Sequence, residues 1–432
     1  MKVAFLGVGL PGHLNPMTTL ARRVKNRGHE VVFISVPDAE PSVRAAQLPF
    51  IPYCENEAPL GSMRQMTDQL SKLQGQAALE FSISAVARGL DASFRNLPQT
   101  LLENRVDALV LDQVEYGLGL VPMNLSMPYA HVSNALHLDY SGTTPFCTFD
   151  WKHETTPEAL ARNQAGLRAF MQVYEPATSI ARAYAKQVAL DIDWTSPFPT
   201  MSELAWLTQT PKEFDFESSH WPSQFHYAGP FHDGVGRIES NFPWDRVTGE
   251  PLIYASMGTL QNGLESVFNT IAEAVGTRRE LQLVLSISPG LDPKHIDSLP
   301  PNCIVVNHAP QVELLQRSAL CITHAGLNTV LESLTQGVPM VAIPITNDQP
   351  GVAARIAHTK TGAYVSFQEM TPSRLSTLLD EVLSNSEYRE NADKMKQAIA
   401  ESNGLERAVD LLEKAFNLPS LAGISRSTEW GL

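Results

Sequence analysis

A histidine and an aspartate stand where an acid–base pair would be useful. His13 opens a helical pattern after the first apolar segment, and Asp112 follows the apolar run Leu109–Leu111. A helix N-terminus disfavours imidazolium and therefore keeps a histidine neutral and basic. A carboxylate bonded to the second ring nitrogen would fix the tautomer and stabilise the charge formed on proton uptake. Singly, His13 could be a cap and Asp112 a loop acid; together they predict a general-base dyad.

A second polar cluster lies in the C-terminal half. Four residues follow an apolar strand and open a helix: His324, Gly326, Asn328 and Thr329. Such a turn presents free backbone N–H groups and small polar side chains to an anion. Glu332 stands one helical turn further on, placed to accept hydrogen bonds from ribose hydroxyls. Each residue alone could be a cap or a turn residue, but their convergence predicts a site for an anionic ligand.

Two more turns are expected to face the same ligand. Asp348 and Gln349 follow a later strand, and a carboxylate beside an amide can hold vicinal sugar hydroxyls. The strand that opens the second half ends in another hydroxyl-and-glycine turn, with Ser256, Gly258 and Thr259. All these turns follow the carboxyl ends of expected parallel strands, where open α/β sheets bind their ligands.

The first strand offers a competing interpretation. Gly7, Gly9 and Gly12 spell G-x-G-x-x-G directly after it, and Asp38 ends the second strand, where a dinucleotide-binding domain places its ribose-binding acid. However, Pro11 removes an N–H that a pyrophosphate cradle would use. We therefore interpret the glycines mainly as a tight strand–helix turn and keep an NAD-dependent oxidoreductase as an alternative.

Composition excludes several classes of function. The 432 residues carry 32 Lys and Arg against 46 Asp and Glu, a net charge of −14, so we expect no nucleic-acid partner. Four scattered cysteines lack metal-ligand or disulfide spacing, and the N-terminus resembles a strand rather than a signal peptide. No segment approaches the roughly 20 apolar residues of a membrane span. A cytoplasmic protein without a stable membrane anchor is expected. The D-x-D triplet Asp191–Asp193 is interpreted as surface acids, not as a metal site.

Both halves alternate apolar strands with helical patterns, which indicates parallel sheets with right-handed crossovers. Strands are expected at residues 2–8, 31–36, 108–111, 129–132, 252–256, 281–287, 303–306, 320–323 and 340–343. A long helix is expected over 157–189, and a linker near 229–241 in the proline-rich stretch that follows it.

This pattern predicts an α/β protein of two Rossmann-like, doubly wound domains facing a central cleft. The first domain is expected over residues 1–235 and the second over 236–417, closed by a helix near 405–416. Residues 418–432 are expected to form a loose tail.

Residues 307–349 resemble the nucleotide-sugar signature of the inverting, UDP-dependent glycosyltransferases of the GT-B fold, which include plant secondary-product and bacterial macrolide transferases. The matched pieces are Ala309-Pro310-Gln311, Thr323-His324-Ala325-Gly326, Asn328-Thr329, Glu332, Gly337-Val338-Pro339 and Asp348-Gln349. The turn Pro11-Gly12-His13-Leu14-Asn15-Pro16 matches the family's catalytic-histidine turn. The phrase CITHAGLNTVLESL, with NDQPGVAARI after it, is similar to bacterial zeaxanthin (carotenoid) glucosyltransferases.

The resemblance implies a role for each matched residue. His13 becomes the general base and Asp112 its partner. Ser256, Gly258 and Thr259 would lie near the phosphates, and His308, Ala309 and Gln311 beside the base and ribose. The diphosphate would be bound by His324, Gly326, Asn328 and Thr329. Glu332 would hold the ribose, and Asp348 and Gln349 the sugar.

Two departures from the family pattern bear on the donor. His308 stands where a tryptophan usually stacks on uracil, so a looser choice of nucleotide is implied, and some family members use dTDP-sugars. Thr346 stands where plant members often carry tryptophan, so a preference for glucose is not assured.

The implied reaction moves a sugar, with inversion, from a UDP-sugar co-substrate to a hydroxyl of a small lipophilic acceptor such as a carotenoid, flavonoid or polyketide. No further cofactor and no metal are expected. Candidates for the acceptor pocket are Met63, Met66, Phe81, Asn134, His137, Tyr140, Phe146, Phe149 and Trp151. A lipophilic acceptor would favour brief membrane contact. A UDP-sugar epimerase and a non-catalytic UDP-sugar binding protein are the remaining alternatives.

Overall fold

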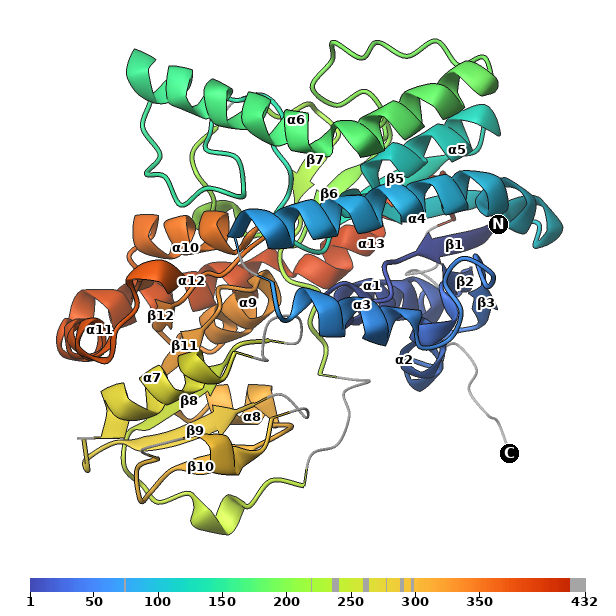
Figure 1. Cartoon of the computed structure of the whole chain (residues 1–432). Helices are drawn as coiled ribbons and strands as arrows, with labels where there is room; N and C mark the ends of the chain where they lie inside the picture. Colours follow the sequence, from blue (N-terminus) through green and yellow to red (C-terminus); the bar gives the residue numbers. More distant parts are fainter. Residues whose placement is uncertain are drawn as a thin grey trace, which may run out of the picture.

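The computed structural model describes residues 1–73, 75–218, 220–234, 241–258, 264–276, 278–287, 291–296 and 299–419. Over these residues the chain forms two parallel β-sheets flanked by helices (Figure 1). Apolar residues alternate between two cores along each central strand: in β1, Ala4 and Leu6 face one cluster, and Val3 and Phe5 face the other. Both faces of each sheet are therefore buried, as parallel sheets require. The predicted α/β fold of two Rossmann-like sheets is confirmed.

The N-terminal sheet has the strand order β3-β2-β1-β4-β5-β6-β7, with every neighbouring pair parallel. Its strands are β1 (Lys2–Leu6), β2 (Glu30–Ser35), β3 (Phe50–Pro52), β4 (Ala108–Asp112), β5 (Tyr129–Ser133), β6 (Trp206–Thr208) and β7 (Phe225–Tyr227). The helices between them are α1 (Pro11–Asn26), α2 (Glu40–Ala45), α3 (Ser62–Leu70), α4 (Gly75–Glu103), α5 (Leu120–Asn124) and α6 (Pro157–Gln187). Short 3₁₀ turns are η1 (Pro37–Ala39), η2 (Gln113–Gly119) and η3 (Lys212–Phe214).

The C-terminal sheet has the order β10-β9-β8-β11-β12-β13, also parallel throughout. Its strands are β8 (Leu252–Ser256), β9 (Gln282–Ser286), β10 (Ile304–Val306), β11 (Ser318–Thr323), β12 (Met340–Ala342) and β13 (Gly362–Tyr364). The helices of this half of the sequence are α7 (Glu265–Gly276), α8 (Gln311–Leu315), α9 (Leu327–Thr335), α10 (Gln349–His358), α11 (Pro372–Ser384) and α12 (Ser386–Ser402), and the chain then continues into α13 (Gly404–Ala415). The 3₁₀ turns η4 (Trp244–Arg246), η5 (Pro293–His295) and η6 (Phe367–Glu369) complete it.

All the strands expected from apolar runs are present, but β3, β6, β7 and β13 were not predicted. Each of these four strands has only three residues. Such segments are too short to show an alternating or continuous apolar pattern. β6 and β7 lie in the proline-rich stretch, where only loop and linker were expected, and they extend the first sheet instead.

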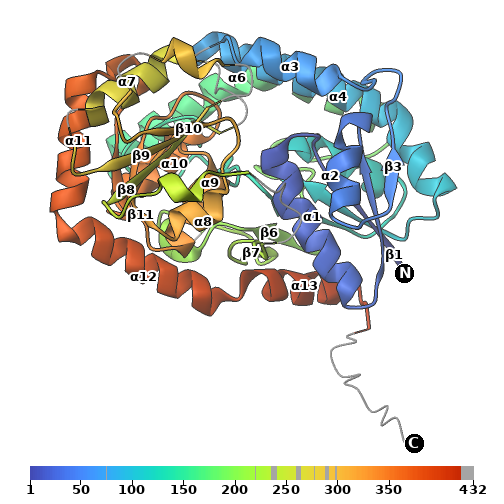
Figure 2. The same cartoon turned by 90° about the horizontal axis from the view of Figure 1, so that it is seen from below.

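The last helix packs on the opposite half from the one expected. We predicted that a helix near 405–416 would close the second domain, but α13 lies beside α1 below the N-terminal sheet (Figure 2). Its apolar residues Ala408, Val409 and Leu412 join the core cluster that holds Phe5 and Met17. The amphipathic pattern of the helix fixed which face is buried, but not against which sheet.

The chain therefore crosses between the halves twice, and the two crossings touch. A Cβ on Gly404, at the start of α13, would overlap the backbone of Gly229, which itself has a φ of +106°. Glycine is the residue that permits both this contact and this backbone conformation. The expected boundary between residues 235 and 236 falls at 235–240, outside the described residues, as does the tail from residue 420 onward. Among the described residues, no helix is long and apolar enough to cross a membrane.

Candidate active site

His13 and Asp112 form a close pair at the carboxyl ends of the adjacent strands β1 and β4. His13 Nδ1 lies 2.8 Å from Asp112 Oδ2, and the side chain of His13 is 18% exposed whereas that of Asp112 is fully buried. Asp112 Oδ1 accepts a hydrogen bond from Val114 N (3.1 Å), and Asp112 Oδ2 accepts a second one from Asn134 Nδ2 (2.8 Å). The carboxylate is thus held on several sides, which orients the imidazole.

The surroundings of His13 favour proton uptake. Burial lowers the pKa of His13, but the charge and hydrogen bond of Asp112 outweigh burial, with smaller contributions from Asp348 and Glu115, so the pKa is raised above its ordinary value. Asp348 belongs to the C-terminal half and Asp112 to the N-terminal half. A proton on His13 is therefore stabilised by carboxylates from both halves of the molecule.

His324 lies between two glycines at the start of α9. A Cβ on either Gly258 or Gly326 would clash with the His324 ring, and Gly258 has a φ of +70°. Burial lowers the pKa of His324 to about 4, and a hydrogen bond with the Ser256 backbone opposes this shift only in part. Within the described part of the chain, His324 Nδ1 is buried and has no hydrogen-bond partner. A neutral imidazole carries one N–H, so His324 Nδ1 can donate to an anion at this helix N-terminus in the tautomer that places the proton on Nδ1.

A chain of polar side chains extends from α8 to α9. Gln311 Nε2 donates to Glu332 Oε2 (2.7 Å) and to Thr329 Oγ1 (3.4 Å), while Gln311 Oε1 accepts from Tyr254 OH (3.0 Å). Glu332 and Thr329 are both buried. These contacts fix the carboxylate of Glu332 close to the α9 N-terminus, where a ribose hydroxyl could bond to it.

Asn328 joins the α9 N-terminus to the N-terminal half. Its Nδ2 donates to Gly12 O (2.6 Å), one residue before His13, and its Oδ1 accepts from Gln209 Nε2 (2.8 Å). Gln209 also donates to the backbone carbonyl of Asn134, whose side chain bonds Asp112. These hydrogen bonds form a closed loop that runs from the base dyad to the expected diphosphate turn and back.

Asp348 also reaches across to the N-terminal half. Its Oδ2 accepts from Leu136 N (3.0 Å), in the loop after β5. Gln349 is buried, and its Oε1 accepts from Ile345 N (2.8 Å) and Thr346 N (3.0 Å). The amide oxygen of Gln349 therefore holds its own loop in shape, and its Nε2 is the group left to meet a sugar.

The other expected donor residues lie around the same end of the C-terminal sheet. Ser256 is buried at the end of β8, and Ser256 Oγ accepts from Gly258 N (3.4 Å). His308 is exposed and Ala309 half-buried, both just after β10. Thr259 lies outside the described residues.

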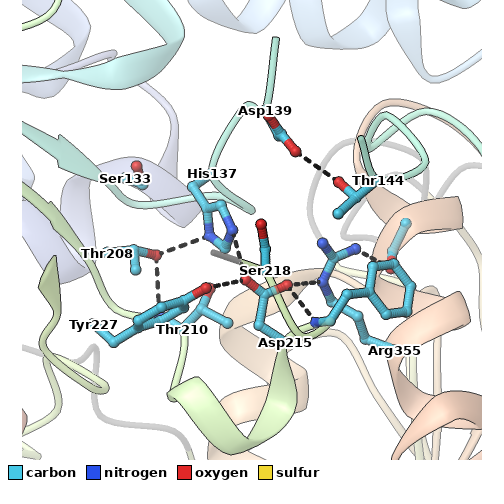
Figure 3. A network of polar contacts seen from close by, with 12 residues as sticks. Ser133, His137, Asp139, Thr144, Thr208, Thr210, Asp215, Ser218, Tyr227 and Arg355 are labelled. Atoms are coloured by element: carbon cyan, nitrogen blue, oxygen red, sulfur yellow. Dashed lines mark hydrogen bonds and ion pairs between the residues drawn. The ribbon is translucent and has the colours of Figure 1, made fainter. Parts of the chain in front are cut away.

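Several residues expected to line an acceptor pocket are buried in packing instead. His137 is 2% exposed; its Nε2 lies 2.9 Å from Asp215 Oδ2, and its Nδ1 lies 3.3 Å from Thr208 Oγ1 (Figure 3). Phe146 is fully buried, with its ring between those of Tyr140 and Phe170 of α6. The sequence of this loop is rich in aromatic and charged residues, but it does not reveal which side chains bond to one another.

The remaining acceptor candidates lie apart, and all of them except the buried Asn134 are half-buried. Met63 of α3 packs beside Gly9, near the His13 turn, while Met66 and Phe81 lie further along α3 and α4. Phe149 stacks on Trp151 at 4.0 Å between ring centroids, and both rings contact Gly166 of α6. Asn134 lies beside the His13–Asp112 dyad, because its side-chain amide donates to Asp112.

Three polar residues of this region were not predicted. Gln209 is fully buried and follows the unpredicted strand β6, so its position at a strand end was hidden. Glu115 lies in η2, three residues after Asp112. Asp215 pairs with Arg355 of α10, where Nε and Oδ1 lie 2.7 Å apart (Figure 3). The spacing of these residues in the sequence does not indicate which residues they contact.

The glycine motif serves packing in this structure. A Cβ on Gly7 would press on Phe33, and a Cβ on Gly9 on Val36. In a dinucleotide site the carboxylate of Asp38 would hold a ribose. Here both of its oxygens accept a hydrogen bond from Gly61 N, each at 3.0 Å. These contacts give no support to the oxidoreductase alternative.

The D-x-D triplet forms a surface turn. Asp193 Oδ1 accepts hydrogen bonds from the Thr195 N–H (2.9 Å) and hydroxyl (2.5 Å). Over the described residues, no group of three or more His, Cys, Asp or Glu side chains is placed to hold a metal ion.

Comparisons with known proteins agree with this arrangement. The family model described as UDP-glucoronosyl and UDP-glucosyl transferase matches residues 205–411. Zeaxanthin glucosyltransferase from Pantoea ananas is 27% identical over 420 residues, covering 96% of each chain. The solved glycosyltransferase of kitacinnamycin superposes with a TM-score of 0.74 at 22% identity, covering 96% of this chain and 98% of that one. Glycosyltransferase VinC, solved in complex with dTDP, gives a TM-score of 0.68 at 18% identity, covering 96% of this chain and 100% of that one.

The solved structures share the two-sheet GT-B fold, and the family model spans the chain from β6 into α13, which includes the whole C-terminal sheet. Residues 205–411 match the UDP-glucoronosyl and UDP-glucosyl transferase family, and the chain is a nucleotide-sugar glycosyltransferase.

Proposed function

We propose that this enzyme transfers a sugar, with glucose as the first candidate, from a UDP-sugar to a hydroxyl of a small lipophilic acceptor, with inversion at the anomeric carbon. The observation that carries the proposal is the contact between the base dyad and the α9 N-terminus, made by Asn328 Nδ2 on Gly12 O at 2.6 Å. This contact joins a proton acceptor from one half to an anion-binding turn from the other. A displacement that removes a proton on one side and releases a diphosphate on the other needs both.

The proton moves to His13 in the proposed step. His13 Nε2 takes the acceptor hydroxyl proton while the oxygen attacks the anomeric carbon, and the bond from that carbon to the diphosphate oxygen breaks. Asp112, bonded to His13 Nδ1, stabilises the imidazolium without taking the proton. Attack from the side opposite the leaving group inverts the anomeric centre.

The diphosphate is proposed to lie at the α9 N-terminus. His324 Nδ1, Asn328 Nδ2 and the adjoining backbone N–H groups would donate to its oxygens, with the helix dipole adding favourable charge. Glu332 would bond the ribose. Asp348 and Gln349 Nε2 would hold the sugar beside Leu136. Residues 1–235, with α13 packed on them, would then act as the acceptor unit, and residues 236–402 as the donor unit.

The acceptor class rests on two observations. The relatives act on lipophilic compounds by name, zeaxanthin among them. In this chain, the apolar residue Met63 packs beside Gly9 near the His13 turn, and the apolar residue Leu136 follows β5 beside Asp348. A carotenoid, flavonoid or polyketide hydroxyl fits that setting better than a sugar acceptor does.

The test is transfer by His13→Ala, read by mass spectrometry with a panel of UDP- and dTDP-sugars against carotenoid and phenolic acceptors. Loss of a general base should reduce transfer by about 10²–10⁴-fold. His29→Ala is the matched control, because it removes an equally short histidine–carboxylate contact, 2.9 Å from His29 Nε2 to Glu413 Oε1, beside α13. Full activity in His13→Ala would remove His13 from the mechanism. Isomerised sugar nucleotide without acceptor would point to an epimerase instead.

A further inference from the structure

Glu115 is an acid beside the base dyad that the proposed chemistry does not use. It lies in η2, the turn that Asp112 caps, and its φ of −101° and ψ of 35° break the helical conformation of that turn. Its Oε2 is buried, and no described residue bonds to it. The side chain as a whole is only half-buried, so part of it remains accessible.

The polar groups near Glu115 have other partners. It lies within electrostatic range of Asp112 and His13, and of Tyr53 and Cys54. The hydroxyl of Tyr53 pairs with Ser93 Oγ at 3.2 Å, and His13 Nδ1 pairs with Asp112. The Tyr53 hydroxyl and His13 Nδ1 therefore already have partners.

The protonation state follows from this setting. Burial, with a smaller contribution from the charge of Asp112, raises the pKa of Glu115 to about 8, and the charge of His13 opposes this shift in part. At pH 7 the carboxyl is therefore mostly neutral, with an O–H to donate and a carbonyl oxygen to accept. A buried polar group without a partner costs about 1–3 kcal/mol of stability, so a purely structural role would be better served by an apolar residue or an amide with a partner. A ligand that supplies the partner explains the placement.

We propose that Glu115 hydrogen-bonds a second oxygen of the acceptor, close to the hydroxyl that His13 deprotonates. The enzyme would then select acceptors with paired oxygens: catechols, vicinal diols, or a hydroxyl next to a carbonyl. Glu115 would act as a specificity-determining residue and His13 as the base. The inference rests on the proposed function, because that function places the acceptor over His13.

The test compares two isomers of equal size and polarity by calorimetric binding at pH 7, with UDP present. 2,3-Dihydroxynaphthalene has its hydroxyls side by side, whereas 2,7-dihydroxynaphthalene has them far apart. The wild type should bind the 2,3-isomer about tenfold more tightly, the factor given by one hydrogen bond of about 1.4 kcal/mol. Glu115→Leu should bring this ratio close to one, while Glu115→Gln, which keeps both a donor and an acceptor, should preserve most of it.

Three outcomes would overturn the inference: equal binding of the isomers to the wild type, no binding of either, or an unchanged preference in Glu115→Leu. Circular dichroism of each variant shows whether it is folded. If Glu115→Leu does not fold, the isomer preference of Glu115→Gln is the remaining test. Binding does not require turnover. A preference that depends on Glu115, without transfer from any nucleotide sugar, would therefore contradict the proposed function but would still assign Glu115 to the binding of paired oxygens.

Discussion

Arg355 and Asn328 both reach from the C-terminal half to the N-terminal half, but in different chemical settings. Arg355 Nε lies 2.7 Å from Asp215 Oδ1, its guanidinium covers the Phe216 ring at 4.2 Å, and both charged side chains are less than 5% exposed. Asp215 also accepts from Tyr227 OH (2.6 Å), as Figure 3 shows. Asn328 makes two uncharged hydrogen bonds and is only half-buried.

This difference indicates which contact between the two halves is permanent and which can exchange its hydrogen-bond partner. We call these contacts the Arg355 junction and the Asn328 junction. Burial raises the pKa of Asp215, but Arg355 and His137 outweigh burial, so the pKa is lowered and the carboxylate stays ionised. Separating that pair would leave two desolvated charges, which is costly. The amide of Asn328 can exchange Gly12 O for a diphosphate oxygen at little cost. We therefore expect the Arg355 junction to be permanent and the Asn328 junction to respond to the donor.

Arg355→Met should have the largest effect on stability. It leaves Asp215 buried without its cation, and the loss is expected to be about 3–5 kcal/mol in the free energy of unfolding. Urea denaturation followed by circular dichroism measures this loss. Arg355→Lys, which keeps the charge but not the planar fork, should lose less. If Arg355→Met is as stable as the wild type, the contrast between the junctions fails.

Among changes at the Asn328 junction, Asn328→Ala should reduce the transfer activity most. Removing a donor to the leaving diphosphate is expected to slow transfer by about 10²-fold, with a smaller loss of stability than in Arg355→Met. Asn328→Asp sharpens the result, because aspartate can still accept from Gln209 but cannot donate to a phosphate. Activity that survives in Asn328→Asp would assign the role of Asn328 to the Gln209 contact.

Gln209→Leu should have a smaller effect, because Gln209 acts through its neighbours. It removes the bonds to Asn134 and Asn328 that connect the dyad with the donor turn. A loss of about tenfold in kcat, the value of one hydrogen bond, is expected with KM for the donor little changed. Steady-state kinetics separates the two terms. An effect on KM alone would place Gln209 in donor binding.

Glu115→Gln should have the smallest effect, on stability against pH. The carboxyl has a pKa of about 8 in the folded protein against an ordinary 4.5. Between these values the folded state holds a proton that the unfolded chain has released, so stability falls as pH rises through this window. The amide does not titrate, so Glu115→Gln should gain melting temperature over the wild type at pH 8 and gain less at pH 5. Glu273→Gln, an exposed acid on α7, is the control. An equal gain at both pH values would show that Glu115 is not desolvated.

The sequence was informative where a residue follows a detectable strand. His13 and Asp112 could be paired because β1 and β4 are long apolar runs whose carboxyl ends meet in a parallel sheet. Gln209 follows β6 in the same way, but β6 has only three residues and left no pattern to place it.

Prediction failed where packing partners decide the outcome. The apolar face of α13 could not reveal that it covers the N-terminal sheet rather than its own. His137 and Phe146 have the composition of a ligand pocket, yet Asp215 and α6 cover them. Contacts between segments far apart in the sequence depend on the assembled fold, and local pattern does not encode them.

The most direct test of the account is calorimetric titration with UDP of the wild type, His13→Ala and His324→Ala. We predict that the wild type and His13→Ala bind UDP with similar affinity, because His13 acts only on the acceptor, while His324→Ala loses most of that affinity. Absence of binding to the wild type, or binding that His324→Ala leaves intact, would contradict the claim that the α9 N-terminus holds the diphosphate.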